Sequence, residues 1–294
     1  MQFQKITMVG VGLLGGSIGL AARQRKLARE IAGFVRREAS LRDCEKAGAV
    51  DYATTDLLAA VSDADLVILC TPLAQMRALT EQLLPALKRG AIVTDVGSVK
   101  MSVVRDICGL IRKAGGHFIG SHPMAGGEKM GVLAAKADLF ENTICVVTPT
   151  KNSNPPALRK VEQFWKSLGC RLLRLTPQLH DRMVSRSSHL PHVAAAALVN
   201  LVLHPHNHQT RVDLCATGFR DTTRIASGSP EMWRDIALAN RQNLTRSVDV
   251  LVAELKQFQA ALNKNDAKAV ETFYATAKQL RDHWCARGAS TSPE

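Results

Sequence analysis

The 294-residue chain has few aromatic residues, no long hydrophobic run and no obvious targeting segment. Aromatic residues make up 4% of it, so the stacking platforms by which proteins bind single-stranded nucleic acids are not expected. No apolar run reaches the length that spans a bilayer. The first residues lack the basic, apolar and small-residue regions of a signal peptide. These absences predict a cytoplasmic protein with no membrane partner.

The chain also lacks a CxxC pair, which is the spacing typical of metal and redox sites. Its seven cysteines are scattered, and most stand beside apolar residues, as in "VILC" and "TICVV". We interpret them as free, buried thiols in a reducing compartment. The histidines of "HPHNH" (204–208) have no cysteine or aspartate nearby, so we interpret them as turn residues and expect no metal.

Positive charge is the strongest compositional bias, with a net charge of +12. Such a charge commonly indicates a polyanionic partner. Here, however, the basic residues are spread along the chain, with only a mild cluster over 22–38. A small anionic substrate or cofactor explains the charge equally well, and we expect no nucleic-acid partner.

The first half of the chain alternates β-branched runs with amphipathic stretches, which is typical of an α/β fold with a mostly parallel sheet. The predicted strands cover residues 5–10, 30–35, 66–71, 91–96, 117–120, 143–149 and 170–176. After about residue 177 the strand pattern stops. We therefore predict a nucleotide-binding domain over 1–176 and an all-helical domain over 177–294.

The predicted helical domain contains unusually long helices. A helix around 180–203 includes Pro191, which predicts a kink. From Ser229 and Pro230 a helical period continues for more than thirty residues, and a last helix begins near Asp266. Because one chain offers little surface to cover such helices, we expect them to pack against a second copy in a homodimer.

A Gly-x-Gly-x-x-Gly pattern formed by Gly10, Gly12 and Gly15 follows the first strand and precedes a helix. In that context the pattern predicts a dinucleotide site, with phosphate bound at the helix N-terminus. The same spacing also occurs as a tight turn in unrelated α/β proteins. The other expected cofactor contacts are Leu13 and Leu14 within the glycine pattern, Thr71 at the end of the strand over 66–71, and Pro72 just after it.

The end of the second predicted strand bears on the choice of cofactor. A site for NAD has an acidic residue about 20 positions after the glycine loop, but Arg36 and Arg37 stand at this place. Guanidinium groups bind a 2′-phosphate well, so we predict a preference for NADP over NAD. Alternatively, the two arginines are only a solvated strand end.

Two polar residues follow neighbouring predicted strands. Ser98 lies in "TDVGSVK" and His122 in "HFIGSHPMAGG". Ligands of open α/β sheets bind beyond the carboxyl ends of the strands, so these side chains are expected beside the nicotinamide. There a histidine accepts the proton of a hydroxyl group while hydride leaves the same carbon. The alternative is a loop histidine bonded only to backbone.

The helical half adds further polar residues. On a regular helix, Ser185, His189 and His192 fall on one face and form either a site wall or the capping groups of a kink. The stretch over 216–235 is rich in glycine and carries Arg224 and Trp233, together with Arg220, Asp221 and Arg234. An arginine there either clamps a carboxylate or belongs to surface ion pairs.

Six motifs together resemble the prephenate/arogenate dehydrogenases of tyrosine biosynthesis. They occur in order over about residues 5–260 and read "GVGLLGGSIGLA", "DLVILCTP", "TDVGSVK", "GSHPMAGGEKMGV", "HDRMVSRSSHLPHVAAAAL" and "GFRDTTRIASGSPEMWRDI". The resemblance implies an N-terminal Rossmann-type domain and a C-terminal helical domain that forms a homodimer. No regulatory or mutase domain is expected after it.

The resemblance also implies roles for individual residues. His122 is then the catalytic histidine that bonds the ring hydroxyl, Ser98 bridges that hydroxyl or the imidazole, and Arg224 binds the ring carboxylate. The other implied substrate-site residues are His192, with His180 and His189 near it, Glu128, Asp221 and Trp233. The chain departs from the family pattern at Gly127, where members often carry Thr or Ser, so one substrate hydrogen bond is removed.

The implied activity is the NADP-dependent oxidative decarboxylation of arogenate and/or prephenate, both of which are dicarboxylates. The NADP preference and the absence of a regulatory domain favour arogenate or the use of both. One alternative is a β-hydroxyacid dehydrogenase, but its catalytic lysine has no counterpart in "HDRMVSRSSHLPH". Another is an NADP-sensing regulator without turnover, which Ser98 and His122 beside the nicotinamide argue against.

Overall fold

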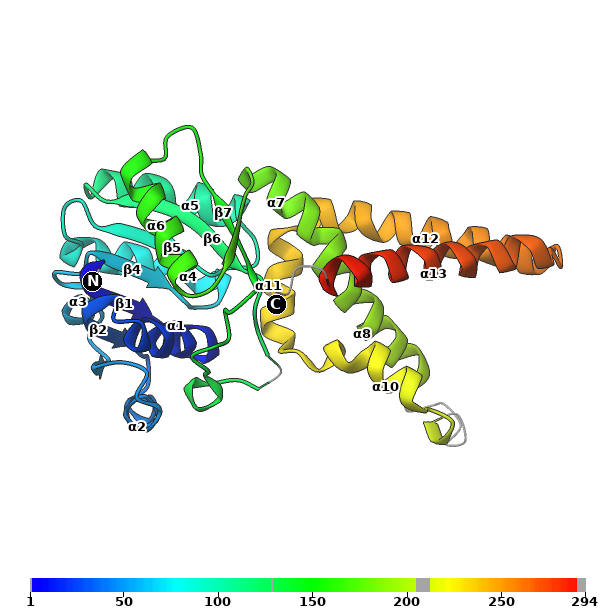
Figure 1. Ribbon diagram of the computed structural model, residues 1–294, viewed down its shortest axis with the longest axis horizontal. Helices are drawn as coiled ribbons and strands as arrows, with labels where there is room; N and C mark the ends of the chain where they lie inside the picture. Colours follow the sequence, from blue (N-terminus) through cyan, green and yellow to red (C-terminus); the bar gives the residue numbers. More distant parts are fainter. Residues whose placement is uncertain (1, 128, 205–211, 290–294) are drawn as a thin grey trace. The chain divides into compact units, whose positions relative to one another are not determined.

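The computed structural model describes residues 2–127, 129–204 and 212–289. The chain divides into two compact units, Met1–Arg241 and Gln242–Glu294. The first unit contains a β-sheet flanked by helices and then a group of further helices, and the second is a helical hairpin (Figure 1). The predicted fold class, an α/β sheet domain followed by helices, is confirmed. The predicted boundary after residue 176 stays a prediction.

One eight-stranded sheet organises the first unit, in the order β3-β2-β1-β4-β5-β6-β7-β8. Its strands are β1 (Phe3–Val9), β2 (Ala28–Phe34), β3 (Tyr52–Thr54), β4 (Leu66–Leu69), β5 (Ile92–Asp95), β6 (His117–Pro123), β7 (Ile144–Thr148) and β8 (Arg171–Arg174). All neighbours pair in parallel except β6 and β7, which are antiparallel. The strand order reverses between β1 and β4, the place where open α/β sheets bind ligands.

Helices cover both faces of the sheet, so the strands are apolar on both sides. The helices are α1 (Leu13–Gln24), α2 (Glu38–Ala47), α3 (Leu57–Val61), α4 (Leu73–Leu83), α5 (Met101–Lys113) and α6 (Pro155–Ser167). One core joins Ile18 of α1 and Trp165 of α6 to the sheet. The second core joins Met76 of α4 and Ile107 of α5 to the opposite face.

Two strands differ from the prediction by more than two residues at an end. Strand β3 is short and was not predicted. Strand β6 continues to Pro123, three residues beyond the predicted end, because β7 pairs with Gly120–Pro123 in antiparallel register. A residue expected in a loop, His122, is therefore held in the sheet opposite Val146.

The helices that follow the sheet are interrupted at Pro191. They are α7 (Pro177–Val184), a π-helical turn over Ser185–His189, α8 (Leu190–Val202), α10 (Thr217–Thr223) and α11 (Pro230–Ala239). Proline has no N–H to donate and its ring crowds the preceding turn, so the helix widens before it. The predicted kink is thus a π-helical turn, a feature that occurs frequently at functional sites.

The predicted single helix after Pro230 is wrong, because it breaks at Asn240. Helix α11 ends at Ala239 and α12 (Arg241–Asn263) begins two residues later, while Asn240 has φ −109° and ψ 23°. Its side chain is buried and turned toward α7, where its amide nitrogen lies 2.8 Å from the Asp181 carbonyl oxygen. A tertiary contact therefore overrides the local helical period.

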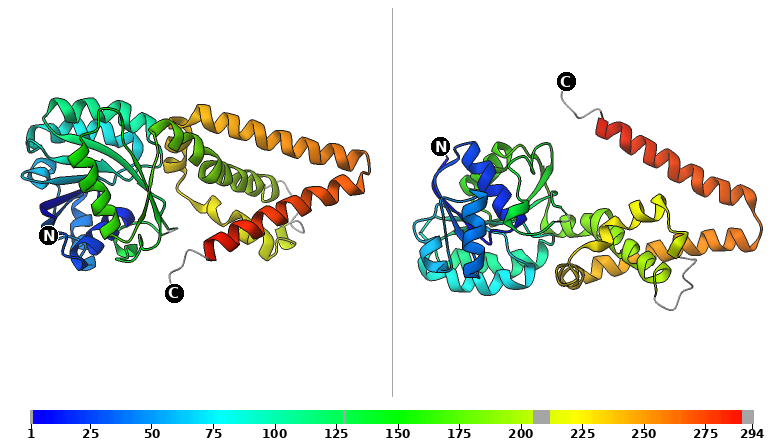
Figure 2. Two further views of the ribbon diagram at one scale, coloured as in Figure 1. Left: turned by 45° about the horizontal axis from the view of Figure 1, so that its top comes forward. Right: turned by 90° about the horizontal axis from the view of Figure 1, so that it is seen from below.

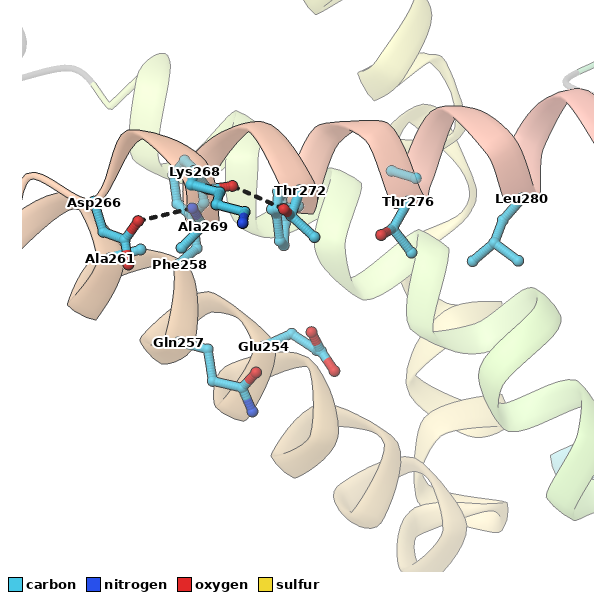
Figure 3. Close-up of a pocket in the computed structure, with 12 residues that line it drawn as sticks. Glu254, Gln257, Phe258, Ala261, Asp266, Lys268, Ala269, Thr272, Thr276 and Leu280 are labelled. Atoms are coloured by element: carbon cyan, nitrogen blue, oxygen red, sulfur yellow. Dashed lines mark hydrogen bonds between the residues drawn. The ribbon is translucent and has the colours of Figure 1, made fainter.

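The second unit consists of α12 and α13 (Ala267–Ala289), whose axes diverge from the connecting turn (Figure 2). The Asp266 side chain caps α13 through a 2.9 Å bond from Ala269 N. Between the helices lies a groove of about 760 Å³ lined by Phe258, Phe273 and Leu280, among others (Figure 3). Among the described helices, none is long and apolar enough to cross a membrane.

All seven cysteines are free, as the sequence predicts. Their predicted burial is correct only in part. Cys44, Cys145 and Cys170 are buried, whereas Cys285 on α13 is exposed.

Candidate active site

The loop between β1 and α1 has the geometry that binds a dinucleotide phosphate. Gly10 adopts φ +101°, a conformation that favours glycine. A Cβ at Gly15 would lie 2.1 Å from the Gly10 carbonyl oxygen, whereas a Cβ at Gly12 would meet no atom within 4 Å. Gly10 and Gly15 thus permit the tight turn, and Gly12 leaves space at the N-terminus of α1 for a phosphate.

The other predicted cofactor residues surround this loop. Leu13 and Leu14 begin α1, and Pro72 precedes α4. Thr71 lies against the loop, since a Cβ at Gly10 would be 2.9 Å from its methyl carbon. The Thr71 hydroxyl oxygen is buried and has no hydrogen-bond partner among the described residues. These features fit a dinucleotide, which would supply that partner.

Arg36 and Arg37 lie exposed between β2 and α2, and Arg37 precedes the first residue of α2. The only carboxylate beside them in the chain is Glu38, which begins α2. Among the described residues, no ion pair engages either arginine. The geometry therefore leaves both guanidinium groups accessible to an anionic ligand.

His122 is buried at the carboxyl end of β6, with 7% of its surface exposed. The sequence places it in a glycine-rich loop, and this expectation is wrong because pairing with β7 extends the strand past it. Burial, together with His180, Lys100 and His189, lowers the pKa of His122 well below the ordinary histidine value. The imidazole is therefore neutral near pH 7, as a general base must be.

A chain of short hydrogen bonds joins His122 to a buried carboxylate. The His122 Nδ1 and His180 Nε2 atoms are 2.9 Å apart, and His180 Nδ1 lies 2.7 Å from Asp181 Oδ1. His180 and Asp181 are fully buried in the middle of α7. Burial lowers the pKa of His180, although Asp181 opposes this effect. The three side chains form one buried, hydrogen-bonded network.

A buried ion pair lies beneath His122. The Lys100 ammonium contacts the Asp95 carboxylate and donates a 2.7 Å bond to the Ser121 carbonyl oxygen. Asp95 also accepts bonds from the Gly97 and Ser121 backbone N–H groups. Burial lowers the pKa of Lys100, against the opposing effect of Asp95. This network connects the end of β5 rigidly to the strand that carries His122.

His189 lies in the π-helical turn and is 1% exposed. Its Nδ1 atom is 3.2 Å from the side-chain nitrogen of Asn240. Burial lowers the pKa of His189 to about 4, while Asp181 and the nearby Ser98 backbone oppose this shift. Ser98, in the loop after β5, therefore lies close to the π-helical turn at the His189 imidazole.

His192, Trp233 and Arg224 form a second group next to His189. The His192 and Trp233 rings stack at 3.7 Å, and the His189 and Trp233 rings meet edge to face at 6.2 Å. His192 Nδ1 donates a 3.0 Å bond to the Ile225 carbonyl oxygen. Burial, and to a lesser extent the Arg224 charge, lowers the pKa of His192. An anion beside His192 would therefore meet the Arg224 guanidinium.

Trp233 offers an additional donor. Its Nε1 atom is buried and has no hydrogen-bond partner within the described chain. A Cβ at Gly228 would lie 2.5 Å from this nitrogen, so only glycine fits there. Buried donors are rarely left unpaired, which marks this position as one that a ligand would satisfy.

The remaining predicted site residues lie in different surroundings. The Ser98 backbone lies beside His189, but its half-buried hydroxyl has no protein partner among the described residues. Gly127 lies against Leu13, the first residue of α1. Asp221 is exposed beside Arg220, and Glu128 lies outside the described residues. So do residues 205–208 of the histidine-rich turn.

Several network residues were not singled out from the sequence. Asp181 follows His180 directly in "LHDRM", Asn240 ends a run of helix formers, and Lys100 and Asp95 lie at the two ends of "DVGSVK". Their only signal is a polar residue within an apolar pattern. That signal shows burial with a partner but does not identify the partner.

Comparison with known families supports the same arrangement. Residues 18–174 match the family of the prephenate dehydrogenase nucleotide-binding domain, and residues 176–279 match the prephenate dehydrogenase dimerization domain. The two matches cover the sheet apart from β1, and the helices that follow it as far as residue 279.

Individual relatives agree. The chain is 35% identical to prephenate dehydrogenase of Bacillus subtilis, over 94% of this chain and 75% of that one. It is 32% identical to cyclohexadienyl dehydrogenase of Zymomonas mobilis, over 95% of each.

A solved structure of Aquifex aeolicus prephenate dehydrogenase, in complex with hydroxyphenyl propionate and NAD+, superposes with a TM-score of 0.90 at 30% identity. The match covers 96% of this chain and 99% of that one. From its motifs, its fold and these matches, the chain belongs to the prephenate/arogenate (cyclohexadienyl) dehydrogenase family.

Proposed function

We propose that this protein catalyses the oxidative decarboxylation of arogenate and/or prephenate, with NADP as the preferred cofactor. The substrate is a cyclohexadienyl ring with a hydroxyl group opposite a ring carboxylate. The products are tyrosine from arogenate and 4-hydroxyphenylpyruvate from prephenate. A bound nicotinamide dinucleotide supplies the hydride acceptor, and the protein supplies a base, orientation and a cation.

One observation carries the proposal: a neutral, buried His122 is linked through His180 to the Asp181 carboxylate, at the sheet edge where nucleotides bind. Hydride loss from an alcohol carbon requires a base for the hydroxyl proton. His122 accepts that proton, and the chain of hydrogen bonds to Asp181 stabilises the imidazolium that forms. The half-buried Ser98 hydroxyl orients the substrate hydroxyl.

The cationic part of the site fits the ring carboxylate. Arg224 and His192 lie close together, and Trp233 presents a buried donor beside them. An arginine binds a carboxylate through two parallel hydrogen bonds. After oxidation the carboxylate leaves as CO₂, because the ring becomes aromatic. Arg224 therefore holds the group in place and takes no part in the hydride step.

The cofactor preference rests on Arg36 and Arg37. Both are exposed just beyond β2, where an NAD site has a carboxylate to hold the ribose hydroxyls. Their guanidinium groups favour a 2′-phosphate over those hydroxyls. The Aquifex aeolicus relative was crystallised with NAD+, so NADP preference is a property proposed for this chain.

The chain is proposed to act as a homodimer through its helical residues and to work in the cytoplasm. The matched dimerization domain supports the homodimer. In the second unit, large apolar side chains are exposed on both helices; they include Leu255, Leu262, Tyr274, Leu280 and Trp284. Burial of such a surface is a strong driving force for association.

Initial rates of reduced-cofactor formation test the proposal, measured with each of the two substrates and each of the two cofactors. We expect turnover of at least one substrate and a higher kcat/KM for NADP+ than for NAD+. Equal or better use of NAD+ would refute the cofactor preference alone. Absence of turnover in all four combinations would refute the activity.

A further inference from the structure

The Asp181 carboxylate is surrounded by hydrogen-bond donors. It accepts bonds from Lys100 N at 2.7 Å, from Met101 N at 2.9 Å and from His180 Nδ1 at 2.7 Å. The first two are backbone groups at the N-terminus of α5, so Asp181 caps that helix from another element. Backbone N–H groups can only donate, and a carboxylate can only accept. His180 therefore carries its proton on Nδ1.

This proton fixes the next histidine in the chain. In a neutral imidazole protonated at Nδ1, the Nε2 atom is an acceptor. His180 Nε2 lies 2.9 Å from His122 Nδ1, so His122 must donate from Nδ1. The Nε2 atom of His122 then has no proton and is free to accept one.

Asn240 fixes the opposite tautomer in His189. The Asn240 side-chain nitrogen lies 2.8 Å from the Asp181 carbonyl oxygen. Two oxygens in this position would repel, so the nitrogen, not the amide oxygen, faces Asp181. The same nitrogen is 3.2 Å from His189 Nδ1 and can only donate. His189 Nδ1 therefore accepts, and the proton of this ring lies on Nε2.

We propose that Asp181 is the positioning residue that sets His122 and His189 in opposite tautomers. Its carboxylate acts through His180 and makes His122 Nε2 an acceptor. Its backbone carbonyl acts through Asn240 and makes His189 Nε2 a donor. The consequence for catalysis rests on the proposed function: one ring receives the substrate proton, and the other donates to an oxygen of the anionic substrate.

The tautomers are measurable without turnover, because ring nitrogens with and without a proton have clearly different ¹⁵N chemical shifts. The experiment uses the full-length protein with ¹⁵N-labelled histidine at neutral pH. His122→Asn and His189→Asn variants assign the signals by removing them. We expect His122 to be protonated at Nδ1 and His189 at Nε2. The reverse tautomer at either ring would overturn the proposal.

Three variants separate the two branches. In Asp181→Asn the single remaining side-chain oxygen must serve three donors, and the charge that holds the proton on His180 Nδ1 is lost, so both the His180 and His122 tautomers are expected to shift toward the alternative forms. Asn240→Leu is expected to alter only the His189 signals. If Asp181→Asn fails to fold, His180→Phe tests the same branch, because it removes the acceptor for His122 Nδ1. Unchanged His122 signals in that variant would contradict the proposal.

The matched control is Asp56→Asn. Asp56 caps α3 by accepting bonds from Leu58 N and Ala59 N at 2.9 and 3.0 Å, with no histidine beside it. It therefore loses the same charge at a helix N-terminus without touching the network. We expect wild-type histidine signals and a wild-type kcat in this control.

Kinetics give the second readout. In Asp181→Asn we expect kcat to fall by roughly 10²–10⁴-fold, since the wrong tautomer cannot accept the proton, while KM changes little. A purely structural role predicts similar losses in the two capping variants and unchanged tautomers in folded protein. If wild-type protein shows the expected tautomers but no turnover, the proposed function fails and the positioning role of Asp181 stands.

Discussion

His122 and His189 lie in the same site but are held by different kinds of structure. His122 extends from β6, whose backbone pairs with β5 over residues 117–119 and with β7 over residues 120–123. His189 lies in a π-helical turn and is oriented by Asn240, at a break between two helices. Both are buried, and burial lowers both pKa values. The strand therefore fixes the position of His122, whereas contacts within the helical residues set the hydrogen bonding and the charge of His189.

The difference matters because, in the proposed function, the two sides meet the substrate with opposite chemistry. The strand side would present the base, His122, at the edge of the sheet where the dinucleotide is proposed to bind. The helical side presents donors and a cation, namely His189, Trp233 and Arg224. Loss of the base should therefore slow the chemical step, and loss of the cation should weaken binding.

The largest effect is expected for His122→Asn, which removes the base and leaves the strand intact. We expect kcat to fall by roughly 10²–10⁴-fold with a modest change in KM, since proton acceptance contributes about that much. Steady-state kinetics with the preferred substrate measure both constants. Normal turnover in this variant would remove His122 from the catalytic role and abolish the contrast between the two sides.

Arg224→Ala tests the helical side. We expect KM to rise roughly 10- to 100-fold while kcat stays within a few-fold, because a charge-assisted hydrogen bond contributes about 1.5–3 kcal/mol. Arg234→Ala is the control, since Arg234 is exposed and paired with Asp235. An unchanged KM in Arg224→Ala would mean that the ring carboxylate is bound elsewhere.

A smaller effect is expected for Arg36→Ala on the nucleotide side. The kcat/KM for NADP+ should fall about tenfold, because one exposed guanidinium contact with the 2′-phosphate is lost, and the value for NAD+ should stay the same. Arg42→Ala, which removes an exposed arginine further along α2, controls for the general loss of positive charge. Parallel losses with both cofactors would show that Arg36 does not recognise the 2′-phosphate.

The smallest effect concerns pH. The pKa of His122 lies well below the ordinary 6.5, so the base stays unprotonated as the pH falls through 6.5. Plots of log kcat/KM against pH should therefore be level from about pH 8 to 6.5 and decline only at lower pH. A decline with its midpoint at or above 6.5 would show that His122 is not desolvated as the structure indicates.

The sheet half of the fold could be predicted well because its information is local. Strand runs, the glycine pattern and the positions of Ser98 and Arg36 depend on period and spacing alone. The end of β6 could not be predicted, because it depends on pairing with β7, more than twenty residues away in the chain. The prediction that His122 lies in a loop failed for that reason.

The helical half shows the limit of periodicity more clearly. Its strong helical period concealed the break at Asn240, where a buried hydrogen bond to the Asp181 carbonyl outweighs helix propensity. The π-helical turn before Pro191 also changes the angular spacing of His189 and His192 around the helix axis from the spacing predicted for a regular α-helix. Residues that act through a tertiary network, such as Asp181, carry no spacing pattern from which a partner could be inferred.

The most direct test of the proposed function is the stoichiometry of one reaction followed to completion. With NADP+ and the preferred substrate, we predict equal amounts of reduced cofactor, CO₂ and aromatic product. Reduced cofactor formed without CO₂ would indicate simple alcohol oxidation, as in a β-hydroxyacid dehydrogenase, and would contradict the account. Cofactor binding with no reduction at all would equally contradict it and would favour a sensor without turnover.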